Sequence, residues 1–256
     1  KRTLSLALAA IMLVGMMVVS ASAASYNNLT DKDEIVNKDA VSMLVSLGII
    51  EGKPDGSYGP TENVDRAQMA KMLSVIMNKG VDNSALYQSV NSGLTDITSH
   101  WAKGHINYCY TTGIIAGRGT GTFDPSATVT ALEAAKMLLV AVGYDPAIEG
   151  FEGADWAINV SVRADEQGIF EGFTKDLSAP LNRDDAALLI YNALDVEMIQ
   201  SYTTNNYPIV YSDHRTILSD KYGVIKVEGV VTANEWAILD DDTDTALQEG
   251  KTRIYN

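Results

Sequence analysis

Cysteine is almost absent from this chain, since Cys109 is the only one among 256 residues. An intrachain disulfide is therefore excluded, and the fold must hold together without covalent cross-links. Cys109 lies within a helical apolar pattern, so we interpret it as a core residue rather than as a reactive thiol.

Positive charge and histidine are also scarce. The 19 Lys and Arg residues face 33 Asp and Glu residues, which gives a formal charge of −14. Such an acidic chain is poorly suited to nucleic acid or to an anionic membrane surface. His100 and His105 are five residues apart, which is the wrong spacing for one helical face and unlike a zinc motif. We interpret both as surface or hydrogen-bonded polar residues.

Motifs of catalysis and cofactor binding are missing. The sequence has no Gly-x-Ser-x-Gly, no phosphate-binding loop and no nucleotide fingerprint. The acidic pair Asp184-Asp185 lies in a predicted helix, where a solvated face is expected rather than a hydrolytic pair. The aspartate-rich run 240–244 resembles a calcium loop, but its glycine and terminal glutamate are out of place. We therefore predict no enzyme activity, no cofactor and no metal site.

Only one long apolar run occurs, at residues 4–19. It follows the basic pair Lys1-Arg2 and precedes Ala21-Ser22-Ala23, which is the layout of a secretory signal peptide. A bilayer needs roughly 20 apolar residues, more than this run provides. We predict that residues 1–23 are a cleaved signal peptide, that the protein is exported without a membrane contact, and that the chain continues beyond Asn256.

What the sequence does contain is a repeat. The pattern Gly-Ile-(Ile/Phe)-x-Gly occurs at residues 48–52, 113–117 and 168–172. A proline follows each first glycine by twelve residues, at Pro60, Pro125 and Pro180. One such unit cannot bury a core alone, so the copies must pack together. The third copy has fewer residues between its proline and its second helix, so Pro180 need not be equivalent to the other two prolines.

Each copy is predicted to be a helix, a loop and a second helix. Apolar residues with helical spacing precede each first glycine, which is suited to end a helix in the left-handed conformation. The second helices are predicted to begin at Asp65, Thr130 and Asn182, with a capping box in the first two copies. The predicted boundaries are 24–86, 87–146 and 147–199.

The combined pattern resembles S-layer homology repeats over residues 29–197. The second copy is the fullest match, with Leu94-Thr95-Asp96, His100-Trp101-Ala102, Ile106 and Phe123-Asp124-Pro125. The resemblance implies a mainly α fold in which three helix-loop-helix repeats form a pseudo-threefold bundle. It also implies grooves that bind secondary cell wall polysaccharide, often pyruvylated, and a location at the cell wall or S-layer.

Two arginines are candidate ligand-binding residues. Arg66 and Arg183 occupy the first position of predicted helices, where free N–H groups and the helix dipole favour an anion. A guanidinium there can hold a carboxylate with two hydrogen bonds. The alternative is a solvated residue at a helix start. Ala131 replaces the arginine in the second copy, so we expect one or two working grooves rather than three, unless Arg118 substitutes.

Trp101 and Trp156 are the other candidate ligand-binding residues. Their flat, amphipathic rings can stack on sugar rings, but each also begins a helical stripe and can serve as a packing anchor. Val36 occupies the matching position of the first copy, which favours packing.

Residues 200–256 differ from the repeats. The segment 221–232 alternates and is rich in valine, which predicts a strand, and Ile254-Tyr255 can begin another. We predict an incomplete β-rich domain. Two functions are compatible with this organisation: a non-catalytic wall anchor of a surface protein, or the anchor region of an exported enzyme such as a polysaccharide hydrolase. Self-association in a surface layer is a further possibility, through residues 200–256.

Overall fold

The computed structural model describes residues 25–226, 230–233, 247 and 251–255. The predicted signal peptide and the aspartate-rich run 240–244 lie outside these residues. The chain divides into two compact units, one ending at Tyr222 and the other beginning at Gly223. Within the described residues, no helix has the length and apolar character needed to cross a membrane.

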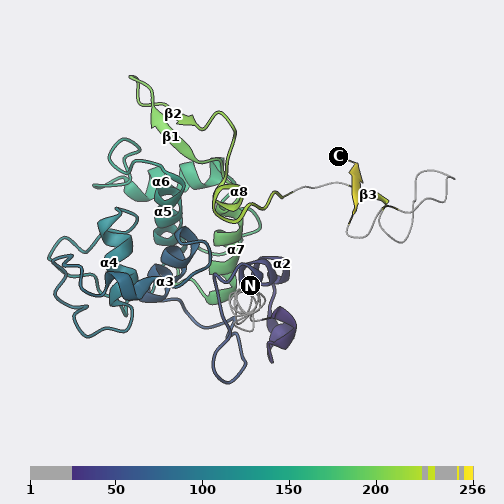
Figure 1. Ribbon diagram of the computed structural model, residues 1–256. Coiled ribbons are helices and arrows are strands. Elements are labelled where there is room, and N and C mark those ends of the chain that lie inside the picture. The colour runs from purple at the N-terminus through teal and green to yellow at the C-terminus, as the bar shows by residue number, and fades with distance from the viewer. Residues whose placement is uncertain (1–24, 227–229, 234–246, 248–250, 256) are drawn as a thin grey trace, which may run out of the picture. The chain divides into compact units, whose positions relative to one another are not determined.

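The first unit is mainly helical (Figure 1). Six helices form three successive pairs, which we call the first, second and third helix pairs. Their bounds are α2 Lys38–Ser46 with α3 Arg66–Met77, α4 Lys103–Thr111 with α5 Ala131–Val142, and α6 Trp156–Glu166 with α7 Arg183–Ala193. Short 3-10 turns cover Tyr26–Asn28, Lys32–Glu34 and Ser84–Tyr87.

The second helix of each pair begins where the capping residues predict. The side chains of Asp65 and Thr130 each accept a hydrogen bond from the backbone three residues on, and both capping boxes are complete. Asn182 accepts a hydrogen bond from the Asp185 N–H, without the reciprocal contact. These caps satisfy N–H groups that the helix itself leaves without partners.

The three pairs are joined at their centre by a closed ring of backbone hydrogen bonds. Val64 donates to the Leu181 carbonyl at 2.8 Å, Leu181 to Val129 at 2.8 Å, and Val129 to Val64 at 2.9 Å. Each of these residues immediately precedes a helix cap, so equivalent positions of all three pairs meet at one point. This ring gives the three pairs the pseudo-threefold arrangement that the family resemblance implies.

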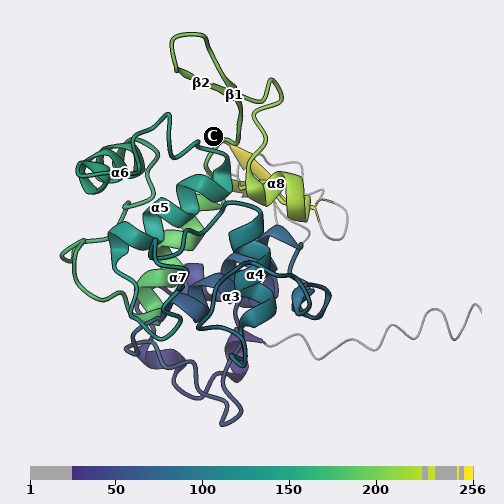
Figure 2. The same ribbon diagram turned by 90° about the vertical axis from the view of Figure 1, so that its left-hand side faces the viewer.

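Helix packing closes the same ring further out. The helix α3 packs on α4, α5 packs on α6, and α7 packs on α2, so the last pair returns to the first. Figure 2 shows α7 and α5 crossing near the middle of this unit. One contact of the closing pair is a carboxylate: Asp184 accepts hydrogen bonds from the Asn37 backbone N–H at 3.2 Å and side-chain amide at 3.0 Å. Asp184 and Asp185 are buried, so the expectation of a solvated acidic face is wrong.

Hydrogen bonds at the helix starts show which loop residues are equivalent. The N–H at the second position of α3, α7 and α5 donates to a carbonyl of a neighbouring loop, and these carbonyls belong to Pro125, Pro60 and Leu177. Leu177 therefore takes the place of the two prolines in the third pair. Pro180 is not their equivalent, because the third loop is three residues shorter.

The core runs through all three pairs. Leu44, Leu73, Ile106, Leu139 and Ile190 are fully buried and belong to one apolar cluster. Cys109 is buried in the same cluster, and burial raises the pKa of its thiol, which confirms a packing role.

A hairpin and a short helix follow the third pair within the first unit. Strands β1 Ile199–Tyr202 and β2 Pro208–Val210 pair antiparallel and project at one end in both views (Figures 1 and 2). Helix α8, Ile217–Tyr222, then packs on α3. The second unit contains an antiparallel pair of β3 Val230–Ala233 and β4 Arg253–Tyr255. The β-rich end is thus confirmed, but the strand predicted over 221–232 is wrong at its start, because Lys221 and Tyr222 belong to α8.

Candidate functional site: two equivalent grooves

Arg66 leaves its own helix pair and enters the loop of the next one. Its Nε donates to the Phe123 carbonyl and its Nη2 to the Ala116 carbonyl, both at 2.8 Å. The guanidinium carbon lies 4.4 Å from the centre of the Phe123 ring. Arg66 is buried, with 4% of its surface exposed. It therefore fixes the loop of the second pair as well as offering a cation there.

Arg183 makes the same contacts one step round the ring. Its Nε donates to the Tyr58 carbonyl at 2.8 Å, and its Nη2 donates to the Glu51 carbonyl at 3.3 Å. Its guanidinium carbon lies 4.7 Å from the Tyr58 ring centre. The two predicted arginines thus occupy matching positions in the loops of the first and second pairs, and neither is simply solvated.

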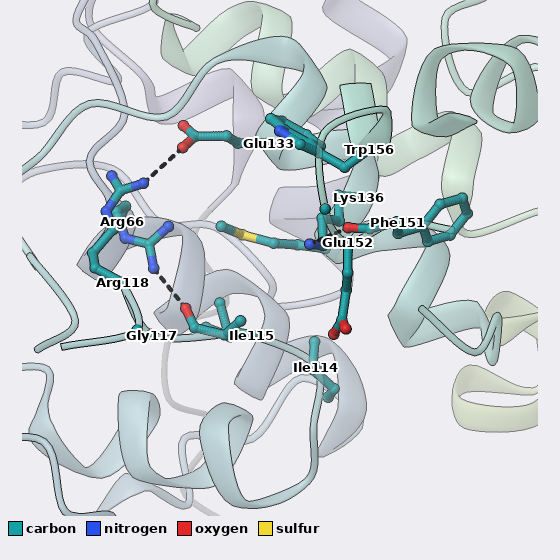
Figure 3. Close-up of a pocket in the computed structure, with 14 residues that line it drawn as sticks. Arg66, Ile114, Ile115, Gly117, Arg118, Glu133, Lys136, Phe151, Glu152 and Trp156 are labelled. Carbon is teal, nitrogen blue, oxygen red and sulfur yellow. Dashed lines mark hydrogen bonds and ion pairs between the residues drawn. The ribbon is translucent and has the colours of Figure 1, made fainter. Parts of the chain in front are cut away.

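A cavity of about 640 Å³ opens beside Arg66, which we call the Arg66 groove (Figure 3). It is built from three helix pairs, because Arg66 comes from the first, the loop 114–119 and helix α5 from the second, and Trp156 from the third. Figure 3 shows Arg66 and Arg118 next to each other, with Lys136 and Trp156 farther along the cavity.

A second cavity of about 220 Å³ lies beside Arg183, which we call the Arg183 groove. Its wall comes from the loop 49–53, from Lys71 on α3 and from Trp101 ahead of α4. Each component has a counterpart in the Arg66 groove. The matched pairs are Arg183 with Arg66, Lys71 with Lys136, Met72 with Met137, Gln68 with Glu133, and Trp101 with Trp156.

Arg66 stays charged near neutral pH despite its burial. Burial and the nearby Arg118 lower the pKa of Arg66 to about 10, while acidic neighbours raise it. Burial also lowers the pKa of Lys136, whose Nζ lies 5.6 Å from the Trp156 ring centre. Arg118 donates to Glu133 at 3.1 Å, so one acid at this rim is already paired. The groove thus presents a net excess of positive charge on a strongly acidic chain.

The tryptophans do not behave as simple packing anchors. Trp101 is 56% exposed, and Val36 at the matching position of the first pair is 81% exposed. The interpretation that these positions are used for packing is therefore wrong for both residues. Trp156 is partly buried against the core, yet it also lines the Arg66 groove. Each tryptophan lies in a groove with an arginine and a lysine that come from the other two helix pairs.

A third equivalent position lies between the third and first helix pairs and the loop of the third pair. It lacks the arginine, the lysine and the tryptophan of the two grooves. Ala131 stands where the other grooves have arginine, and it faces the loop of the third pair because Leu132 donates to the Leu177 carbonyl. Leu188 replaces the lysine and Val36 the tryptophan. A cleft of about 440 Å³ exists between α7 and α2, but among the described residues that line it Lys38 is the only basic one. Arg118 lines the Arg66 groove instead, so it does not substitute for the missing arginine.

Lys71 and Lys136 are site residues that the sequence analysis missed. Each follows the first residue of its helix by five positions, and that shared offset was the available signal. Asp31 and Asp96 are further supporting residues, because each carboxylate accepts two backbone N–H groups of the loop that carries Tyr58 or Phe123. Among the described residues, no cluster of histidine, cysteine and acidic side chains could hold a metal ion.

Comparison with known proteins supports the resemblance in two regions. The S-layer homology domain family matches residues 28–70 and 93–135, which cover most of the first two helix pairs. The third pair lies outside these matched regions.

Relatives include both structural proteins and enzymes. The chain is 27% identical over 246 residues to a cell surface protein of Thermoanaerobacter kivui, covering 94% of this chain and 29% of that protein. It is 33% identical over 113 residues to an S-layer protein of Bacillus licheniformis, covering 44% of this chain and 12% of that protein. It is 30% identical over 173 residues to an amylopullulanase of Thermoanaerobacterium thermosulfurigenes, covering 62% of this chain and 9% of that protein. The chain thus spans less than a third of the length of each of these relatives.

Proposed function

We propose that this chain anchors a cell-surface protein to the cell wall by binding an acidic wall polysaccharide in the Arg66 and Arg183 grooves. The observation that carries the proposal is the duplication of one constellation. An arginine, a lysine and a tryptophan from three different helix pairs meet in each groove. The same three residues are all replaced at the third equivalent position.

The chemistry of this constellation suits a carboxylated sugar. A guanidinium and an ammonium group attract a carboxylate, and the loop that the arginine contacts lies beside both. The indole ring beside the arginine and the lysine offers an apolar face on which a pyranose ring can stack. A pyruvate ketal places a carboxylate on an otherwise neutral sugar ring, so it presents both features at once. Binding through two grooves on one chain would also strengthen attachment to a repeating polymer.

The organisation of the chain follows from this proposal. We infer that residues 147–199 form a third S-layer homology repeat, which completes the ring but contributes no anionic groove. Residues 1–23 act as an export signal, and the wall anchor precedes a part of the protein that the β-rich segment introduces. The relatives support either a surface-layer protein or an exported enzyme as the anchored part, because both kinds are represented. The anchor itself needs no catalysis in either case.

The direct test is a pull-down of the purified chain on cell walls, before and after extraction of their acidic polysaccharide. We expect the chain to sediment with intact walls and to stay in solution with extracted walls. Lys71→Ala should reduce retention about tenfold, because it removes a charged group from the Arg183 groove and leaves the hydrogen bonds of Arg183 to the loop in place. Lys38→Ala, an exposed change of equal charge at a residue that lines neither groove, should leave retention unchanged. Equal retention on both kinds of wall would contradict the proposal.

A further inference from the structure

A buried histidine lies directly beneath the Arg183 groove. His105 on α4 is 3% exposed, and it occupies a core position between α3 and α4. The equivalent residues of the other helix pairs, eight positions before the first glycine, are Ala40 and Val160, and both are buried. The other pairs therefore fill this position with an apolar side chain, and only this one places an ionisable group there.

His105 has hydrogen-bonding partners for its charged form. Its Nδ1 lies 2.6 Å from the Ser74 hydroxyl, and that hydroxyl also donates to the Lys71 carbonyl at 2.9 Å. Its Nε2 lies 3.6 Å from an oxygen of Asp82. In the protonated ring, Nδ1–H can donate to Ser74 while Nε2–H faces the Asp82 carboxylate. Protonation thus leaves no buried polar atom of the ring without a partner.

The same ring contacts the wall of the Arg183 groove. The centres of the His105 and Trp101 rings are 6.3 Å apart, in an edge-to-face arrangement. Lys71 is close enough for its charge to act on His105. Trp101 and Lys71 both line the Arg183 groove. A charge on His105 therefore appears next to two residues that form this binding surface.

We propose that protonation of His105 strengthens the binding of an anionic sugar in the Arg183 groove, so that this groove responds to pH and the Arg66 groove does not. The inference rests on the proposed function, because it assigns a regulation to one of its two sites. The Arg66 groove is a built-in comparison, since its equivalent position holds Val160.

The direction of the response follows from the groups around the ring. Burial lowers the pKa of His105, the charge of Asp82 raises it and that of Lys71 lowers it, with a net shift below the usual 6.5. The imidazole therefore takes up its proton at a lower pH than an ordinary histidine does. One added positive charge roughly 10 Å from a carboxylate is expected to raise affinity about two- to fivefold.

The experiment measures the affinity of each groove separately across pH. The probe is the pyruvate ketal of a methyl hexopyranoside, titrated by calorimetry between pH 8 and pH 5.5. Lys136→Ala leaves the Arg183 groove as the working site, and Lys71→Ala leaves the Arg66 groove. We expect affinity to rise about two- to fivefold toward low pH in the first variant and to stay constant in the second.

Asp82→Asn provides the sharper test without touching the core. The substitution keeps an oxygen to accept the Ser84 N–H, now 2.9 Å from Asp82, but removes the charge that favours the imidazolium. Added to Lys136→Ala, it should move the midpoint of the pH response to lower pH. An unchanged midpoint, or the same pH response in both grooves, would overturn the inference while leaving the proposed function intact. Absence of probe binding in both grooves at every pH would contradict both.

Linkage supplies an independent check on the wild-type protein. If the proton favours the ligand, the ligand must favour the proton by the same factor. Saturation with the probe should therefore raise the pKa of His105, followed by NMR of its ring protons, by about half a unit for a threefold coupling. An unaltered His105 titration in the presence of bound probe would contradict the proposal.

Discussion

Replacing Arg66 with alanine is expected to lower the free energy of unfolding by about 2–4 kcal/mol. The reason is that Arg66 is a buried connector between helix pairs. Its removal leaves the carbonyls of Phe123 and Ala116 without their donors and takes the cation from above the Phe123 ring. Chemical denaturation at neutral pH measures the loss directly.

Arg118→Ala is the matched control for this change. Arg118 lines the same groove and carries the same charge, but its side chain is 37% exposed and its partners are carboxylates at the rim. Exposed ion pairs of this kind contribute about 0–1 kcal/mol. If the two variants lost the same stability, Arg66 would not be the connector that its hydrogen bonds indicate.

Because Arg66 contributes to stability, variants that test ligand binding should be made at other residues of the groove. A loss of binding in Arg66→Ala would not separate a missing ligand contact from a collapsed loop. Lys71 and Lys136 are better probes, because each makes fewer contacts with a loop than the arginines do. Lys136 donates one hydrogen bond to the Phe151 carbonyl, and the Lys71 ammonium lies 3.6 Å from the Glu51 carboxylate. Both sit on the second turn of a helix that Asp65 or Thr130 caps independently.

The second large effect is expected when both lysines are removed together. Lys71→Ala or Lys136→Ala alone should weaken attachment to wall polysaccharide about 10- to 100-fold, because one groove then binds without the other. The double variant should fall to background, since each groove has then lost the lysine that the two grooves share at equivalent positions. Surface plasmon resonance on immobilised polymer measures these steps.

Lys38→Ala combined with Lys251→Ala is the control for net charge. Both residues are exposed, and Lys38 lines the cleft between α7 and α2, which lacks the arginine and tryptophan. This double variant loses the same two charges and should bind as the wild type does. If it weakened binding as much as the groove variant, general electrostatics rather than the two grooves would account for attachment.

The helices could be predicted from the sequence because residues close to each helix end in the chain determine where that helix begins and stops. Asp65 and Thr130 begin helices through side-chain hydrogen bonds to residues three positions on, and Gly113 follows a first helix in the left-handed region. These interactions involve neighbours in the chain, so a single copy of the repeat contains the necessary information. Repetition then indicated that the copies must share a core.

The site could be predicted only in part, because it depends on how the copies meet. Arg183 was identified from its helix position, but its contacts with Tyr58 and Glu51 are more than a hundred residues away along the chain. The exposure of Trp101 and the burial of Asp184 likewise depend on the neighbouring pair. The effect of Ala131 was anticipated, yet the affected position borders the loop of the third pair rather than that of the second. No local pattern specifies which copy an outward side chain will touch.

Counting ligand sites tests the central claim most directly. Calorimetric titration of the purified chain with a monovalent pyruvylated sugar should return two sites per chain, with one site remaining in Lys71→Ala and one in Lys136→Ala. Three equivalent sites, or two sites that persist in both variants, would contradict the account.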